Sequence, residues 1–155
     1  MRKRFVRCIR MVAAGLIVAA CDSESVTAPG SVKGNYYLER VDNVSLPVVF
    51  SASASERYQL LWENLYFDGN GVVTRTQRVD YENTVTGEKR SSESSVTAEY
   101  RVKGDSIEIG SFTPCPINAL CVANDLGVVA DGVLVVRSAR YGGRELSYRA
   151  GIAID

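Results

Sequence analysis

The chain has 155 residues, of which 46% are hydrophobic and 23% charged, with 18 basic residues, 18 acidic residues and no histidine. This is enough chain for one domain with a buried core. The lack of histidine excludes the serine and cysteine triads that use an imidazole base, and neither a G-x-S-x-G nor a Walker phosphate-binding motif occurs.

The first twenty residues have the pattern of a secretory signal. Met1 to Arg10 contains five basic residues and no acidic one, and the next ten residues, MVAAGLIVAA, carry no charge. A helix of ten residues spans only ~15 Å, against roughly 30 Å for the hydrocarbon core of a bilayer. The sequence therefore predicts a signal peptide over residues 1–20 rather than a transmembrane anchor.

This segment ends in Val18-Ala19-Ala20-Cys21, which resembles the lipobox of bacterial lipoproteins. The resemblance implies cleavage just before Cys21, a diacylglyceryl group on its sulfur and acylation of its new amino group. Two or more acyl chains hold a protein stably on a membrane, whereas one chain binds marginally. The alternative is an ordinary cleaved signal in which Cys21 is incidental. We therefore expect an exported lipoprotein on the periplasmic face of a bacterial membrane; Asp22 resembles an enterobacterial inner-membrane retention signal, which does not hold in all bacteria.

Cleavage would leave an acidic protein. Residues 1–20 hold five of the 18 basic residues and none of the 18 acidic ones, so the rest of the chain has 13 basic and 18 acidic residues, a net charge of −5. Such a protein has no long-range attraction for nucleic acid, which is not an expected partner. Residues 22–33 (DSESVTAPGSVK) are small and polar. We expect the acylated cysteine and a flexible tether over residues 21–33, then a single domain over residues 34–155.

Alternating apolar residues and Gly, Asp or Asn turns dominate the rest of the chain, and no helical period is sustained. Short strands at close spacing favour a small antiparallel up-and-down β-barrel of about eight or nine strands, with a sandwich as the alternative. The predicted strands are Asn35–Val41, Leu46–Ala52, Tyr58–Phe67, Val72–Tyr81, Ser95–Lys103, Ser106–Phe112, Leu126–Ala130, Val133–Ala139 and Glu145–Ala150.

Turn length predicts the register of the hairpins. A two-residue turn at Gly104-Asp105 pairs Val102 with Ile107 and Tyr100 with Ile109 on one face, and Arg101 with Glu108 on the other. Asp131-Gly132 predicts another hairpin, between the apolar strands Leu126–Ala130 and Val133–Ala139. If the turn Asp68–Gly71 is symmetric about Gly69-Asn70, one face holds an aromatic-rich set: Tyr58, Leu60, Trp62, Tyr66, Val73, Val79 and Tyr81.

Several of these segments together resemble small bacterial lipoproteins with a lipocalin-like barrel. They are GNYYLERV at Gly34–Val41 followed by Leu46-Pro47, the Asp68-Gly69 hairpin, and the closing strand LSYR at Leu146–Arg149. The resemblance covers most of the chain after the tether. It implies a barrel fold, and the function of those proteins is largely unassigned.

Cys115 and Cys121 enclose the five residues PINAL between two predicted strands. Two nearby cysteines of an exported chain normally join in the oxidising compartment, so we predict a structural disulfide. Two alternatives remain. A zinc site would need two more ligands in a chain without histidine, and redox-active pairs usually have a C-x-x-C spacing.

Two sets of residues bear on function. The carboxylates of Glu39, Glu63, Asp80, Glu99 and Glu108 could pair inside a barrel for acid–base work, but most fall on the polar side of alternating strands, so we expect solvated faces and no enzyme. Five aromatic residues suggest a ligand cavity, with filling of the core as the alternative: Tyr58, Trp62, Tyr66, Tyr81 and Tyr100.

The sequence thus favours a lipid-anchored, non-enzymatic envelope protein that binds a small apolar or amphipathic ligand and needs no metal or cofactor. Its membrane contact would be made by acyl chains on Cys21. The alternative is an envelope structural or protein-interaction module that uses its outer surface or the loop Thr84–Ser94 (TVTGEKRSSES).

Overall fold

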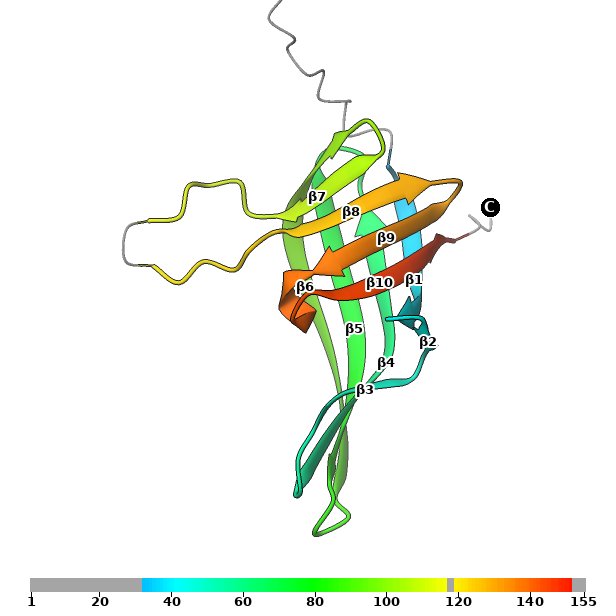
Figure 1. Cartoon of the computed structure of the whole chain (residues 1–155), viewed down its shortest axis with the longest axis vertical. Coiled ribbons are helices and arrows are strands. Elements are labelled where there is room, and N and C mark those ends of the chain that lie inside the picture. Colours follow the sequence, from blue (N-terminus) through cyan, green and yellow to red (C-terminus); the bar gives the residue numbers. More distant parts are fainter. Residues whose placement is uncertain (1–31, 117–118, 152–155) are drawn as a thin grey trace, which may run out of the picture.

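Ten antiparallel strands and one short 3-10 turn form the part of the chain that the computed structural model describes, residues 32–116 and 119–151 (Figure 1). The predicted signal peptide, Cys21 and residues 22–31 lie outside the described residues. The elements are β1 Gly34–Val41, β2 Val44–Ser45, β3 Val48–Ala52, β4 Glu56–Phe67, β5 Val72–Asn83, β6 Lys89–Lys103, β7 Ser106–Gly110, β8 Asp125–Ala130, β9 Val133–Ser138, η2 Ala139–Tyr141 and β10 Arg144–Ala150.

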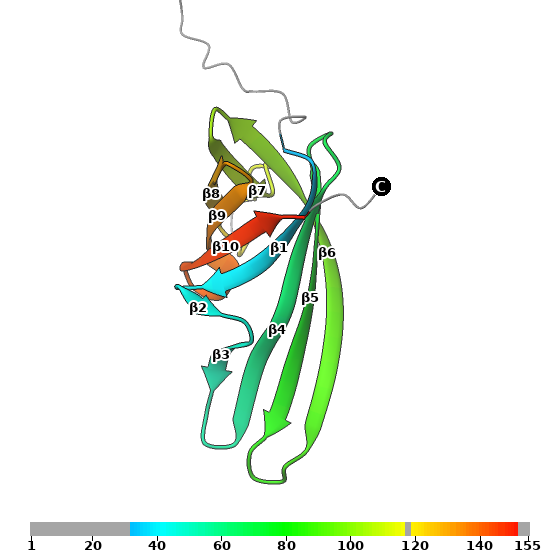
Figure 2. The ribbon, with the colours of Figure 1, turned by 90° about the vertical axis from the view of Figure 1, so that its right-hand side faces the viewer.

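Eight of these strands close into a barrel, which confirms the predicted fold class over the sandwich. From β4 to β10 each strand pairs with the next one in the chain, β10 pairs with β1, and β1 pairs with β4 to complete the ring. The short strands β2 and β3 flank β1 and β4 in the connection between them. Figure 2 shows that β4, β5 and β6, with β3 beside β4, extend beyond the remaining strands as a long sheet.

The closed part of the barrel is filled by side chains. Seventeen buried hydrophobic residues form one cluster, including Phe67, Tyr100 and Tyr148. The ring of Phe67 packs edge-on against that of Tyr100, with 4.9 Å between centroids. Val32 also belongs to the core at 2% exposure, and its carbonyl accepts a hydrogen bond from the Tyr100 hydroxyl at 2.9 Å. The packed domain therefore begins at least two residues before Gly34, inside the segment predicted as tether.

The hairpin at Gly104-Asp105 has the predicted register. Val102 pairs with Ile107, Tyr100 with Ile109 and Arg101 with Glu108. Gly104 has φ = 57°, the left-handed conformation that favours glycine at the first position of a tight turn. The hairpin at Asp131-Gly132 is also confirmed, since Ala130 pairs with Val133 across it.

The register predicted for the β4–β5 hairpin is wrong near its turn. Phe67 pairs with Val73, because the connection takes five residues, with the Asp68 carboxylate accepting the backbone N–H groups of Asn70 and Val72 at 2.7 and 3.0 Å. A bulge at Leu61 restores the predicted pairing beyond it. The pairing between the turn and the bulge is therefore shifted by one residue from the prediction. This shift places each β4 side chain in that stretch on the opposite face of the sheet from the one predicted.

Strand β6 is longer than predicted. Only residues 84–88 of the segment Thr84–Ser94 form a turn, because β6 begins at Lys89 and pairs with β5 from there to Glu99. Residues 89–97 are exposed on both faces, so their sequence lacks the apolar alternation that signals a strand. The predicted strand Leu46–Ala52 begins two residues later, as β3 at Val48, because Pro47 has no backbone N–H to donate to a ladder; the short strand β2 before Leu46 was not predicted.

Candidate ligand pocket

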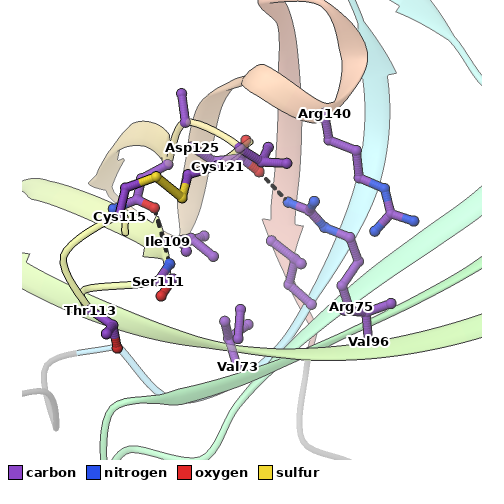
Figure 3. Close-up of a pocket in the computed structure, with 16 residues that line it drawn as sticks. Val73, Arg75, Val96, Ile109, Ser111, Thr113, Cys115, Cys121, Asp125 and Arg140 are labelled. Atoms are coloured by element: carbon purple, nitrogen blue, oxygen red, sulfur yellow. Dashed lines mark hydrogen bonds and ion pairs between the residues drawn. A yellow bond between two sulfur atoms is a disulfide. The ribbon is translucent and has the colours of Figure 1, made fainter. Parts of the chain in front are cut away.

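A pocket of about 820 Å³ opens where β6 extends past β7. The pairing of these strands stops at Glu99 and Gly110, so Val96 and Ala98 have no neighbour on β7. The chain leaves β7 at this point and returns to β8 at Asp125, and this loop forms the opposite wall (Figure 3). The lining residues are Leu65, Val73, Arg75, Val96, Ala98, Ile109, Gly110, Ser111, Thr113, Cys115, Cys121, Val122, Ala123, Asn124, Asp125 and Arg140.

The strand wall of the pocket is mostly apolar and continues into the core. Val73 pairs with Ala98 and Arg75 pairs with Val96, so these side chains share the inner face of β5 and β6. Val73 belongs to the core at 1% exposure, whereas Val96 is 47% exposed because nothing covers it from the β7 side. An unequal length of two neighbouring strands thus leaves apolar surface exposed in the pocket.

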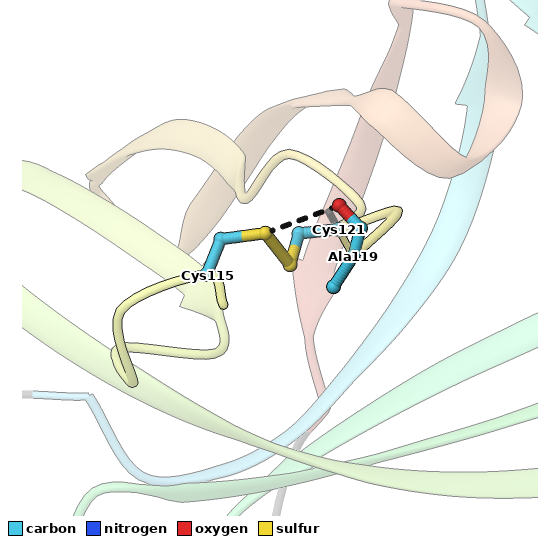
Figure 4. The surroundings of a disulfide bond; sticks show 3 residues. All are labelled: Cys115, Ala119 and Cys121. Carbon is cyan, nitrogen blue, oxygen red and sulfur yellow. Dashed lines mark hydrogen bonds between the residues drawn. A yellow bond between two sulfur atoms is a disulfide. The ribbon is translucent and has the colours of Figure 1, made fainter. Parts of the chain in front are cut away.

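The loop wall carries the disulfide between Cys115 and Cys121, which confirms the predicted pairing (Figure 4). The Ala119 carbonyl oxygen lies 3.5 Å from the sulfur of Cys115; because a disulfide sulfur has no hydrogen, we regard this as a packing contact. Asn124 holds the base of the loop, accepting the Ser111 backbone N–H at 3.0 Å and donating to Glu108 at 2.7 Å. The loop is therefore tied both at its base and near its tip.

Three buried charged residues lie at the inner end of the pocket. Arg75 contacts the Asp125 carboxylate at 2.6 Å and that of Glu63 at 3.2 Å. Asp125 also accepts the Ser138 hydroxyl at 2.9 Å and the Ala139 backbone N–H at 2.8 Å. Burial lowers the pKa of the Arg75 guanidinium, but the two carboxylates outweigh this and raise it overall. Arg75 therefore stays charged, and the carboxylates of Glu63 and Asp125 are both paired with it.

Two tyrosines complete the shell around Glu63. The Tyr148 hydroxyl donates a hydrogen bond to Oε1 of Glu63 at 2.5 Å, and the Tyr141 hydroxyl donates one to Oε2 of Glu63. Burial and the neighbouring carboxylate raise the pKa of both phenols. The Gln77 side chain lies 2.7 Å from the Tyr141 oxygen. Since the single phenol proton goes to Glu63, we infer that Gln77 presents its NH₂ group here.

Glu63 is thus the one predicted carboxylate for which the expected solvated face is clearly wrong, at 1% exposure. The bulge at Leu61 turns it inward. Of the others, Glu39 and Glu99 are exposed, and Glu39 pairs with Arg149 at the surface. Asp80 and Glu108 are half-buried; Asp80 accepts the Ser91 hydroxyl at 2.5 Å, and Glu108 accepts Asn124.

The five aromatic residues predicted to line a cavity are not brought together. Trp62 and Tyr66 lie on the outer face at 37% and 46% exposure, as a result of the register slip. Tyr100 is buried in the core. Tyr58 and Tyr81 form a ring pair with centroids 5.2 Å apart on the extended sheet. None of the five lines the pocket, whose apolar wall is made of smaller aliphatic residues and the disulfide.

The cation Arg140 also lines the pocket, on the turn η2.

Among residues 32–116 and 119–151, no group of three or more His, Cys, Asp or Glu side chains could hold a metal ion. In the same ranges there is no helix long and apolar enough to cross a bilayer. Comparisons with protein families, curated proteins and solved structures found no match to this chain.

Proposed function

We propose that this protein is a lipid-anchored, non-enzymatic envelope protein that binds a small apolar or amphipathic ligand. The observation that carries the proposal is the pocket of about 820 Å³ at the β6–β7 offset. Binding sites for small molecules commonly have volumes of roughly 300–1,000 Å³, apolar walls and a few polar groups. The strand wall and the charged inner end have this combination.

The position of the pocket favours binding without rearrangement of the barrel. The core cluster fills the closed ring, so a ligand has no need to displace it. The open side lies between β6 and the disulfide loop, both of which are reachable from solvent. A ligand would cover Val96 and exchange its exposed apolar surface for contact, at about 25 cal/mol per Å².

Binding rather than catalysis is supported by the fact that the carboxylates and cysteines at the pocket already have bonding partners. Glu63 and Asp125 both accept hydrogen bonds and ion pairs from neighbouring residues, so neither offers a free base at the pocket. The two cysteines in the wall are joined and supply no thiolate.

Membrane anchoring is proposed from the sequence alone. The basic and apolar segments and Cys21 match a lipoprotein signal, and acyl chains on Cys21 would place the barrel beside a source of amphipathic molecules. Export also agrees with the disulfide, which forms in oxidising compartments.

Binding is tested with a soluble form, residues 21–155 with Cys21→Ser, since the barrel closes within residues 32–151. A neutral fluorescent probe such as N-phenyl-1-naphthylamine should bind and be displaced by long-chain amphipaths. Val96→Phe places a larger ring in the wall of the pocket and should weaken probe binding at least tenfold. Thr97→Phe is the matched control, because it places the same ring at the next, exposed residue outside the pocket. Equal probe binding by the two variants would contradict the proposal.

A second candidate function, contact with another envelope protein, is favoured by the free edge of β6. Residues 89–98 pair with β5 only, so one row of backbone donors and acceptors is open to another strand. A photo-crosslinker at Ser92 in whole cells should then trap one specific partner. The same group at Arg137, an exposed residue of β9, is the control. Similar neighbours at both positions would rule this candidate out.

A further inference from the structure

One cation that lines the pocket is not held in an ion pair within the described part of the chain. Arg75 is held by two carboxylates, but Arg140 is exposed and has no ion-pair partner within residues 32–116 and 119–151. Figure 3 shows that the two side chains enter the pocket from different elements, Arg75 from β5 and Arg140 from η2. The charged residues of the lining are Arg75, Asp125 and Arg140, which leaves one net positive charge.

The buried Glu63 brings the charges at this end of the barrel to two positive and two negative, but it offers no free carboxylate oxygen to the pocket. It is absent from the lining, and its two oxygens face Arg75 and the hydroxyls of Tyr141 and Tyr148. Asp125 is likewise occupied, by Arg75 through one oxygen and by Ser138 and Ala139 through the other. An anion at Arg140 would therefore meet no free carboxylate.

The backbone that carries Arg140 is fixed on both sides. Before it, the Ala139 N–H is bound to Asp125 at 2.8 Å; after it, the Tyr141 side chain is anchored to Glu63. Gly142 closes the turn, with φ = 69° and its N–H bound to the Ala139 carbonyl at 3.1 Å. A cation on a fixed turn loses less conformational entropy when it binds an anion.

We propose that the ligand is a single-chain amphipath whose anionic head binds the Arg140 guanidinium while its apolar chain lies against Val73 and Val96. This inference rests on the proposed binding function and names the class of ligand for the same pocket. A guanidinium forms paired hydrogen bonds with carboxylate and with phosphate, so the head is either of these groups.

Three probes with the same chain separate the contribution of the head from that of the chain. Palmitic acid supplies a carboxylate, hexadecyl phosphate a phosphate and hexadecanol a neutral head. Their affinities for the soluble form are measured by displacement of the neutral dye, below the concentrations at which they form micelles. We expect at least one anion to bind about tenfold or more tightly than the alcohol, the ratio that one charge-assisted hydrogen bond supplies. The anion that shows this preference identifies the head group.

Arg140→Gln should remove the preference and leave hexadecanol binding unchanged. Arg137→Gln, which removes an exposed arginine of β9 outside the pocket, should keep the preference. Circular dichroism of both variants checks that the barrel is retained. Equal binding of acid, phosphate and alcohol by the parent protein, or an undiminished preference in Arg140→Gln, would overturn the inference while the binding function stands. No binding of any probe would overturn the binding function itself.

Discussion

At the scale of single residues, Glu63 is held inside the barrel by one ion pair and two hydrogen bonds, from residues of three elements. Arg75 comes from β5, Tyr141 from η2 and Tyr148 from β10. A buried carboxylate is costly without such partners, and breaking a buried ion pair leaves the remaining charge uncompensated. We therefore expect the stability of the barrel to depend on this side chain.

We predict that Glu63→Gln destabilises the soluble form by about 3 kcal/mol, because it leaves Arg75 with one carboxylate and changes the hydrogen bonding of both tyrosines. Urea unfolding followed by circular dichroism measures this. Glu39→Gln is the matched control, since it removes an ion pair with Arg149 between exposed side chains and should leave the unfolding midpoint unchanged. Similar midpoints for the two variants would show that the network contributes little.

The two tyrosines predict how stability depends on alkaline pH. Burial and Glu63 raise the pKa of Tyr141 and Tyr148 in the folded protein above the ordinary value of 10.0. Their contribution is fully present below that value, and it is lost as pH rises above it, because the unfolded chain ionises first. The free energy of unfolding should therefore fall above about pH 10.

An absorbance titration of phenolate, run beside circular dichroism, checks this dependence. The chain has eight tyrosines. We expect Tyr141 and Tyr148 to ionise only as the barrel unfolds. Reversible ionisation of all eight near pH 10 with the fold intact would contradict the burial of Tyr141 and Tyr148.

At the scale of elements, the pocket depends on the loop that joins β7 to β8. Reducing the disulfide, or replacing both cysteines by serine, should lower the free energy of unfolding by about 2 kcal/mol, since the closed loop is short. It should also weaken binding of the neutral dye, because Cys115 and Cys121 line the pocket. Dithiothreitol should affect the parent protein and have no effect on the double variant. A parent protein whose dye affinity and stability are insensitive to reduction would argue against a role for this loop.

The same scale shows which parts of the fold can be read from the sequence. Gly104-Asp105 and the alternation beside it point to one register, and the structure has it. The β4–β5 hairpin could not be read in this way, because nothing in the residue types around Leu61 marks a bulge. The buried position of Glu63 and the outward positions of Trp62 and Tyr66 follow from that bulge and from the five-residue turn, so they were missed together.

The pocket itself was beyond sequence reasoning for a different reason. It depends on how far β6 extends past β7, and the start of β6 is polar on both faces. The aromatic residues suggested a cavity around Tyr58 and Trp62, whereas the pocket is lined by aliphatic residues, the disulfide and several polar and charged side chains. The predicted cysteine pair was the useful signal, since the disulfide lies in its wall.

At the scale of the whole molecule, the filled barrel and the open side pocket are separate parts of the structure. The closed ring of eight strands supplies stability through its core, and the offset strands and disulfide loop leave apolar surface available. The chain enters the barrel at Val32, so a tether before it would set the distance of the pocket from a membrane.

Anchoring makes a separate prediction. Cys21→Ser in the full chain should move the protein from the membrane fraction to the soluble periplasmic fraction, because it removes the site of acylation. Metabolic labelling with palmitate should mark the parent protein and leave the variant unlabelled. Retention of the variant in the membrane fraction would contradict a lipoprotein anchor.

The most direct test of the central claim is native mass spectrometry of the soluble form, purified from cells without detergent. We predict a population whose mass exceeds that of the chain by that of one small amphipathic molecule, released on denaturation and absent from Val96→Phe. A bare chain mass, together with no uptake of the neutral dye or of the palmitic acid, phosphate and alcohol probes, would contradict the account.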